Sequence, residues 1–275
     1  MPELPEVQTI CAYLAEKAEG KTIERVHVWL PRMLKCCSAE LFCKKVAGRK
    51  IERISRKGKY ITLSLSGEVY VIIHLRMTGR LIYEGAGQET EERYERIRFS
   101  LTDQSAIIFG DTRTLGVVYL MESLQHTGIA TFDEMGVDPL EDAFTPQRLG
   151  ELMRGHRANI KAFLLNQKNI GGLGNIYADE ALFLSGIHPF RRCSSLREEE
   201  VRRLHQAIRD CLRQSLEAGG TSFRDYRNGS GERGKNQELL NVYGRKGKRC
   251  LACGSLIEYD KISGRGTHYC PRCQR

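Results

Sequence analysis

The first residues of the chain could do nucleophilic chemistry, because the sequence begins MPELPEV. If an aminopeptidase removes Met1, Pro2 becomes a free secondary amine. An α-amino group has a pKa of about 7.7–8.0, so part of it is neutral near pH 7. A neutral amine can attack a sugar carbon and pass to a Schiff base, while Glu3 exchanges a proton with the sugar and Glu6 tunes both groups. The alternative is that this segment only leads into a helix, since proline suits a first helical turn.

Four cysteines near the C-terminus have the spacing of a metal site. Cys250 and Cys253 form one C-x-x-C pair, Cys270 and Cys273 form another, and sixteen residues separate the pairs. This spacing is typical of a four-cysteine zinc site, and four thiolates leave no open coordination position. We therefore expect one structural Zn²⁺ per chain. Arg265 stands between two glycines inside this segment, which suits a hairpin tip that presents a guanidinium to phosphate.

A glycine-rich stretch, NIGGLGNIY at residues 169–177, joins two segments with helical spacing. Open backbone N–H groups at the start of the second helix would form an anion site. Asn175 could cap that helix or donate to a phosphate, and Lys161 in the preceding helix could point the same way. A pair of helices joined by a turn without any ligand is the alternative.

Two turns in the N-terminal half carry further candidates. RKGKY at residues 56–60 is a tight basic turn between strands, and Lys59 in it could contact a lesion or its phosphate. The alternative is a solvated hairpin. HLRMTG at residues 74–79 ends a hydrophobic strand, where Met77 suits a wedge between stacked bases if the strand end faces DNA. Otherwise Met77 belongs to the core.

The stretch RDYRNGSGERGK at residues 224–235 is rich in glycine and charge. Such a loop is either a substrate lid or a plain surface loop. The lid candidates are Arg224, Tyr226, Gly231 and Gly234.

Periodicity then supplies the elements that must position these residues. Val7, Ile10, Cys11, Leu14 and Ala18 have helical spacing, so we expect one amphipathic helix that ends near residue 20. Short β-type segments with polar turns indicate a sandwich or flattened barrel; they cover 23–29, 51–55, 60–65, 69–75, 97–101, 106–109 and 117–121. Helical patterns follow at 146–153, 158–165, 176–184 and 196–216.

Composition favours an intracellular protein with an anionic partner. The 275 residues carry a formal charge of +9, and residues 244–275 hold eight Lys or Arg against two Asp or Glu. Such a balance favours nucleic acid as the partner; the alternative is a basic protein whose charged surface is merely solvated. We expect no membrane segment and no signal peptide, since no apolar run approaches about 20 residues. Ten cysteines in a reducing compartment favour metal ligands and buried thiols over disulfides.

Several motifs, taken together and in order, resemble the bacterial formamidopyrimidine-DNA glycosylases over essentially the whole chain. They are PELPEV (2–7), GKY (58–60), GNIY (174–177), YGRKG (243–247) and RGTHYC (265–270). The resemblance implies an α+β, bilobal fold with an N-terminal β-sandwich, a helix–two-turn–helix domain and a C-terminal four-cysteine zinc finger. It divides the chain into 1–130 (helix and β-sandwich), 131–145 (linker), 146–240 (helical domain with the lesion lid) and 241–275 (zinc-finger hairpin).

The resemblance also implies a function and a site. It implies a glycosylase that excises oxidised purines such as formamidopyrimidine or 8-oxoguanine from double-stranded DNA, and a lyase that cleaves the abasic site by β,δ-elimination. Pro2 resembles the nucleophile, Glu3 the general acid, Glu6 its support and Lys59 an essential hairpin lysine. The DNA-binding set comprises His74, Arg76, Met77, Arg113, Leu115, Lys161, Asn175, Tyr243 and Arg265. We expect a monomer in the bacterial cytoplasm, at the nucleoid.

The chain departs from the family pattern at two places. The family usually has Asp-x-Arg-Arg-Phe-Gly where residues 111–116 read DTRTLG. Thr114 cannot make a bidentate guanidinium contact to a base, and Leu115 is a smaller wedge than phenylalanine. Asn236 stands near the end of the lid, where the family often has an aromatic. These changes put opposite-base discrimination and the preference for 8-oxoguanine in question.

Two other functions remain open at this point. One is an endonuclease VIII-type glycosylase for oxidised pyrimidines, although Leu4 and the Lys59 hairpin weigh against it. The other is a non-catalytic protein that binds lesions or abasic sites on the same scaffold.

Overall fold

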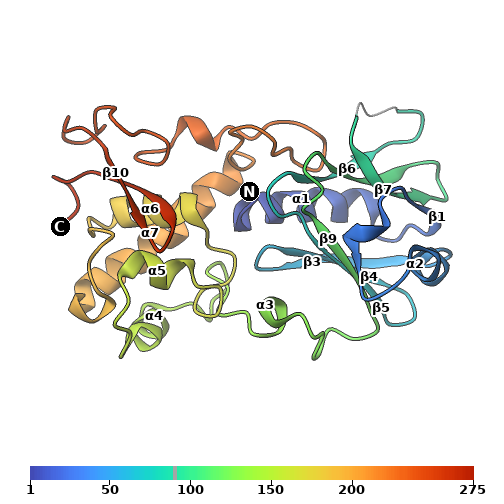
Figure 1. The fold of residues 1–275 in the computed structure, drawn as a ribbon, viewed down its shortest axis with the longest axis horizontal. Coiled ribbons are helices and arrows are strands. Elements are labelled where there is room, and N and C mark those ends of the chain that lie inside the picture. The colour runs from blue at the N-terminus through green and yellow to red at the C-terminus, as the bar shows by residue number, and fades with distance from the viewer. Residues whose placement is uncertain (89–91) are drawn as a thin grey trace. The chain divides into compact units, whose positions relative to one another are not determined.

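Two compact units make up the computed structural model, which describes residues 1–88 and 92–275 (Figure 1). The first unit comprises Met1–Asp133 and Leu216–Gln237, and the second comprises Glu134–Ser215 and Glu238–Arg275. Among the described helices, none combines the length and apolar character that a membrane span needs.

A β-sandwich forms the body of the first unit. One sheet has the strand order β1-β7-β8-β6 and the other β2-β9-β5-β4-β3. The strands are β1 (Ile23–Val28), β2 (Leu34–Lys35), β3 (Ile51–Lys57), β4 (Tyr60–Leu65), β5 (Val69–His74), β6 (Gly79–Glu84), β7 (Glu95–Leu101), β8 (Ala106–Asp111) and β9 (Val117–Met121). Alternate apolar side chains turn inward, as in β7, where Ile97, Phe99 and Leu101 are buried. Side chains from both sheets share one core, so the predicted sandwich is confirmed.

Helix α1 (Leu4–Ala18) packs against β3 and β4 of one sheet and β6 of the other. All five of its predicted apolar positions are buried. The other helices of this unit are short: α2 (Ala39–Val46), α3 (Ala130–Asp133) and the 3₁₀ turns η1 (Pro31–Met33) and η3 (Asn236–Glu238).

Helices make up most of the second unit. They are α4 (Pro146–Met153), α5 (Ile160–Leu165), α6 (Asn175–Leu184) and the first part of α7 (Glu198–Glu217), with the turn η2 (Cys193–Ser195). Their apolar faces enclose a core that includes Phe163, Tyr177 and Leu204. A hairpin of β10 (Glu258–Ile262) and β11 (Arg265–Tyr269) follows, with a small core of its own around Cys250 and Cys270.

The segment Leu216–Gln237 groups with the first unit, whereas the sequence places it in a helical domain of residues 146–240. The physical reason is Tyr226, whose side chain belongs to the core of the first unit. The domain boundaries drawn from the sequence stay predictions.

Candidate active site and nucleic-acid interface

The N-terminus is fixed by the way α1 begins. Glu3 is the N-cap residue, and its backbone N–H donates to Glu6 Oε2 at 2.8 Å as part of a capping box. Pro5 lies in the first turn, where its missing N–H costs nothing. Pro2, Glu3 and Glu6 are buried, while Met1 is exposed. The residues predicted to do chemistry therefore lie at a rigid helix start.

The second oxygen of the Glu6 carboxylate binds the backbone just before the predicted lid. Glu6 Oε1 accepts a hydrogen bond from the Thr221 backbone N–H at 2.8 Å. The Tyr226 hydroxyl donates to the Glu6 carbonyl at 3.4 Å and to the Gly219 carbonyl at 3.2 Å. Burial, followed by the nearby Glu6 charge, raises the pKa of Tyr226 well above its ordinary value. Tyr226 is thus a neutral anchor for the predicted lid.

Lys59 lies in the tight turn between β3 and β4, where Gly58 has a φ of +56°. Helix α1 and strand β3 are antiparallel. Glu19, just after the end of α1, accepts from Ile54 N, whereas Gln8, near its start, accepts from Arg56 Nε at 2.7 Å. The start of α1 consequently points toward the end of β3 and the turn that carries Lys59. Lys59 is 8% exposed, so it is a constrained lysine rather than part of a solvated hairpin.

One end of the five-stranded sheet gathers the other candidates of this unit. Tyr60 pairs with His74 and His74 with Val117, so the start of β4, the end of β5 and the start of β9 coincide. Burial, then the positive charges of Arg76 and Lys59, lowers the pKa of His74 to about 3. His74 is therefore neutral, and its Nδ1 accepts from the Arg76 backbone N–H at 3.0 Å.

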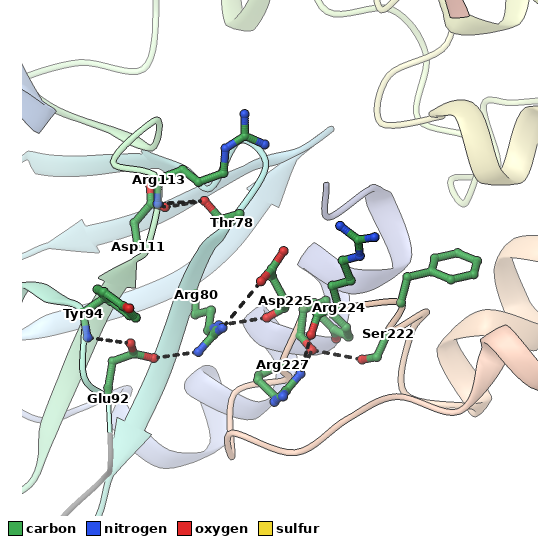
Figure 2. Close-up of polar contacts among 12 residues, drawn as sticks. Thr78, Arg80, Glu92, Tyr94, Asp111, Arg113, Ser222, Arg224, Asp225 and Arg227 are labelled. Atoms are coloured by element: carbon green, nitrogen blue, oxygen red, sulfur yellow. Dashed lines mark hydrogen bonds and ion pairs between the residues drawn. The ribbon is translucent and has the colours of Figure 1, made fainter. Parts of the chain in front are cut away.

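Two turns at this end present exposed apolar side chains, and one buried carboxylate joins them. Met77 and Leu115 are each 44% exposed, so Met77 is not a core residue. Asp111 Oδ1 accepts from Thr78 Oγ1 at 2.5 Å and from Arg113 N at 3.0 Å (Figure 2). Asp111 Oδ2 accepts from the Gly116 N–H at 2.8 Å. Asp111 thus fixes the two turns that carry Met77 and Leu115 relative to each other.

The predicted lid is anchored to the edge strand β6. Arg80 Nε donates to the Asp225 carbonyl at 2.8 Å, and Arg80 Nη1 pairs with Glu92 at 3.3 Å (Figure 2). The Tyr83 N–H donates to the Gly229 carbonyl at 2.9 Å. Because these contacts fix the loop to the sheet, they favour a substrate lid over a plain surface loop.

Just before the loop, Ser222 Oγ donates to the Tyr226 carbonyl at 3.0 Å and accepts from the Gly234 N–H at 3.0 Å, so it joins the two halves of the loop. A Cβ at Gly234 would lie 2.1 Å from the Gly220 carbonyl oxygen, so glycine is required there. Asn236 is buried and donates to Thr221 Oγ1 at 2.8 Å. Where the family often has an aromatic, this chain has a hydrogen-bonded support for the lid base.

Lys161 lies elsewhere than the sequence suggests. Its side chain is fully buried, and its ammonium pairs with Asp179 Oδ1 at 2.6 Å. It also donates to the Gly266 carbonyl at 2.7 Å and to Thr267 Oγ1 at 2.8 Å. The expectation that Lys161 points at phosphate is not met in this conformation, because the zinc hairpin covers it. Lys161 instead positions the hairpin.

Asn175 and Tyr243 lie beside the same hairpin. Asn175 Nδ2 donates to the Gly266 carbonyl at 2.9 Å, so this amide binds the hairpin as well as starting α6. The Tyr243 ring lies 5.1 Å from the His268 ring. Arg265, at the start of β11, is exposed, as its predicted role at a hairpin tip requires.

Sequence reasoning missed the two acidic residues of α6 that organise this surface. Asp179 accepts from the His268 N–H at 2.9 Å, and Glu180 accepts from the backbone N–H groups of Val242 and Tyr243, each at 2.9 Å. Two adjacent carboxylates in the apolar helix NIYADEALFL were the available signal, because a buried charge needs a partner.

The four predicted cysteines come together as a metal site. Their sulfur atoms all lie within 4.8 Å of one another. A Zn–S bond of about 2.3 Å puts tetrahedral sulfurs roughly 3.8 Å apart. The Cys250–Cys273 and Cys253–Cys270 sulfurs lie 3.9 and 3.4 Å apart, so the cluster fits one structural zinc ion.

Three family models match most of the chain. The formamidopyrimidine-DNA glycosylase N-terminal domain matches residues 1–118, the H2TH domain of the same glycosylase matches 135–227, and a zinc finger found in FPG and IleRS matches 247–275.

Proteins of this family are similar to the chain along its full length. The formamidopyrimidine-DNA glycosylase of Pelotomaculum thermopropionicum is 42% identical over 275 residues, covering 100% of this chain and 99% of the relative. A mutant Lactococcus lactis FPG solved with Fapy-dG-containing DNA is 34% identical, with a TM-score of 0.90 and 100% of both chains covered. Lactococcus lactis Fpg solved with abasic-site DNA is 33% identical, with a TM-score of 0.90 and 99% of both chains covered. The chain therefore belongs to the formamidopyrimidine-DNA glycosylase family.

Proposed function

We propose that this DNA glycosylase of base excision repair acts on oxidised purines and cleaves the DNA strand through a Schiff base at Pro2. The observation that carries the proposal is the buried helix start, where one carboxylate, Glu6, holds both the Glu3 backbone and the base of the lid. A nucleophile must be held in one geometry to gain from proximity. The capping box gives Pro2 that geometry.

The chemistry begins once Met1 is removed. The Pro2 nitrogen attacks C1′ of the damaged nucleotide, the C1′–N bond breaks, and the base leaves with the proton that the amine gives up. Glu3 then protonates the sugar O4′, so the C1′–O4′ bond breaks and the ring opens to an iminium ion at Pro2. Elimination then removes the 3′ and 5′ phosphates in turn and leaves a one-nucleotide gap. Lys59 and neutral His74, beside Arg76, face the phosphates of the strand being cut.

The surface around Met77 and Leu115 serves the step before chemistry. Extruding a nucleotide costs a few kcal/mol of unstacking, least for a damaged or mispaired base. Two exposed apolar side chains on a frame fixed by Asp111 can fill the gap that extrusion leaves. The zinc hairpin presents Arg265 to a phosphate. The protein acts as a monomer in the bacterial cytoplasm.

Oxidised purine is the favoured substrate class because the relatives carry that activity in their name and the Lactococcus lactis protein was solved with Fapy-dG-containing DNA. A panel of duplexes tests it, with formamidopyrimidine, 8-oxoguanine and thymine glycol each opposite all four bases. Faster excision of thymine glycol than of either purine would overturn the substrate assignment.

Borohydride trapping tests the nucleophile. The purified chain should form a covalent adduct with an abasic duplex, and Pro2→Gly should abolish the adduct while the variant keeps its fold and its zinc. Mass spectrometry should show Met1 absent from the active protein. A retained Met1 together with tight lesion binding would indicate a non-catalytic binding protein instead.

A further inference from the structure

An arginine from a different part of the chain lies against the loop that carries Leu115. Strand β2 runs parallel to β9, with Leu34 opposite Val118, so the preceding turn η1 lies alongside the end of the 111–116 loop. Arg32, in the middle of η1, donates from Nη2 to Thr114 Oγ1 at 2.5 Å. This contact spans 82 positions of sequence.

The backbone beneath Arg32 is fixed although its side chain is exposed. Met33 is 1% exposed and Leu34 is 7% exposed, so the two residues that follow Arg32 are held in the core. The Arg32 carbonyl accepts from Lys35 Nζ at 3.1 Å. The guanidinium therefore projects from a rigid base, which lowers the entropy lost when it binds a ligand.

The turns at this end of the sheet carry further basic side chains. Arg32, Lys35, Arg76 and Arg113 form no ion pair with any carboxylate in residues 1–88 and 92–275. The nearest carboxylate of the loop, Asp111, is 1% exposed and is engaged by backbone N–H groups. Arginine presents five N–H donors, and the bond to Thr114 uses one of them. Such a surface suits an anionic duplex.

Sheet order decides which DNA strand Arg32 faces. Lys59 precedes β4, His74 ends β5, Leu115 precedes β9 and Arg32 precedes β2, all at one end of the sheet. From β4 to β2 there are three strand spacings of about 4.8 Å each, roughly 14 Å in all. A DNA strand bound at Lys59 and the start of α1 would therefore lie on one side of the wedge residue Leu115. Arg32 lies on the other side of Leu115, where the complementary strand would run.

We propose that Arg32 is a further DNA-binding residue, which contacts the strand opposite the damaged nucleotide and which Thr114 holds in place. Arg32 supplies, from η1, a planar guanidinium with paired N–H donors, which Thr114 does not have. The inference rests on the proposed function, because that function makes Leu115 the wedge and the N-terminus the site of strand cleavage.

Arg32→Ala in the full-length zinc-loaded protein tests the proposal against two substrates. The first is an abasic-site duplex, and the second is the same abasic strand without its complement. Arg53→Ala is the matched control, since Arg53 is also exposed but lies inside β3 opposite Ser64. We expect Arg32→Ala to weaken duplex binding about 10-fold and to leave borohydride trapping of the single strand unchanged. Arg53→Ala should change neither.

The outcomes separate the two proposals. If Arg32→Ala binds the duplex as the wild type does, the role of Arg32 is overturned while the Pro2 chemistry stands. If it loses single-strand trapping in the same proportion, Arg32 acts on the cleaved strand or on the fold, and the proposal also falls. If the wild type traps neither substrate, the proposed function fails on its own account. Thr114→Val, which keeps the guanidinium and removes its acceptor, should give a smaller loss of duplex affinity than Arg32→Ala.

Discussion

Glu6 accepts a hydrogen bond from the Thr221 backbone N–H at 2.8 Å, across 215 positions of the sequence. The other oxygen of the same carboxylate binds the Glu3 N–H at 2.8 Å. One buried side chain thus fixes both the start of α1 and the base of the loop predicted to cover the lesion. A shift at either end must be accommodated by the other, because Glu6 is 1% exposed and has little room to move.

Glu6→Gln should destabilise the protein and slow trapping. A glutamine offers one carbonyl oxygen in place of two carboxylate oxygens, so either Glu3 or Thr221 would face an NH₂ group. A buried N–H without an acceptor costs about 1–3 kcal/mol of unfolding free energy. Chemical denaturation and single-turnover borohydride trapping measure the two effects. Glu16→Gln is the control because that side chain is 69% exposed; equal stability of both variants would contradict the bridging role.

His74 should give the unfolding free energy a distinctive pH dependence. Its pKa is about 3 in the folded protein and about 6.5 in an unfolded chain. Above pH 6.5 the ring is neutral in both the folded and the unfolded protein, so the contribution of His74 to the unfolding free energy is fully present. Between pH 6.5 and about 3 only the unfolded chain takes up the proton, so stability falls by up to about 1.4 kcal/mol per pH unit.

Denaturation midpoints for wild type and His74→Gln between pH 6.5 and 5 check this slope, in a range above the titration of most carboxylates. The variant should be less stable overall, since it loses the ring contact with Tyr60, and its stability should fall less steeply as pH drops. His126→Gln, at an exposed position, should retain the wild-type slope. Parallel curves for wild type and His74→Gln would show that His74 is not the titrating group.

Elements with strong periodicity could be predicted from the sequence, and those with mixed roles could not. The predicted segments 60–65, 117–121 and 146–153 match β4, β9 and α4 at both ends. Strand β6 was missed, because Arg80 and Glu84 leave only Leu81, Ile82 and Tyr83 as an apolar run between them. Both are used in pairs that only the folded chain reveals, Arg80 with Glu92 and Glu84 with Arg98.

The candidate site divides in the same way. The cysteine cluster was predictable because its ligands are defined by spacing. The burial of Lys161 was not, since lysine is almost never fully buried unless paired, and its partner Asp179 lies on another helix. The anchoring of the lid was equally out of reach, because Arg80 and Asp225 are 145 positions apart.

Zinc removal should disable the hairpin without unfolding the first unit. Four thiolates hold one ion around a core that contains little besides Val242, Ile257 and the cysteines themselves, so the metal supplies much of the local stability. Chelation or Cys253→Ser should release one zinc per chain and weaken duplex binding. Metal analysis and gel-shift titration measure both. Cys36→Ser, at an exposed position outside the cluster, should keep its zinc; loss of zinc there would argue against the four-cysteine assignment.

Lys161→Met should loosen the hairpin by leaving Asp179 buried without its cation. Breaking a buried ion pair costs about 3–5 kcal/mol, and Lys161 also holds Gly266 and Thr267. We expect faster zinc release and weaker duplex binding through Arg265. Lys161→Met with Asp179→Asn should recover part of the loss, because asparagine can still accept from the His268 N–H.

The exposed pair between Lys168 and Glu134, with side chains 66% and 53% exposed, provides the comparison for that variant. Lys168→Met should change stability by less than about 1 kcal/mol. Zinc release at the wild-type rate from Lys161→Met would contradict a positioning role for the buried lysine.

Arg80→Met should release the lid from the sheet. The substitution removes the hydrogen bond to the Asp225 carbonyl and the pair with Glu92, while the Tyr83 N–H still binds Gly229. Amide hydrogen exchange in residues 222–234 should become faster, since the segment loses its contacts with the Arg80 side chain and keeps the hydrogen bond from Tyr83. Excision of a damaged base should slow more than trapping at an abasic site, because an abasic site presents no base for the lid to cover. Arg98→Met is the control: Arg98 is also paired twice, with Glu84 and Glu95, but not with the lid. If both variants left exchange in the lid unchanged, Arg80 would be only a surface residue of the sheet.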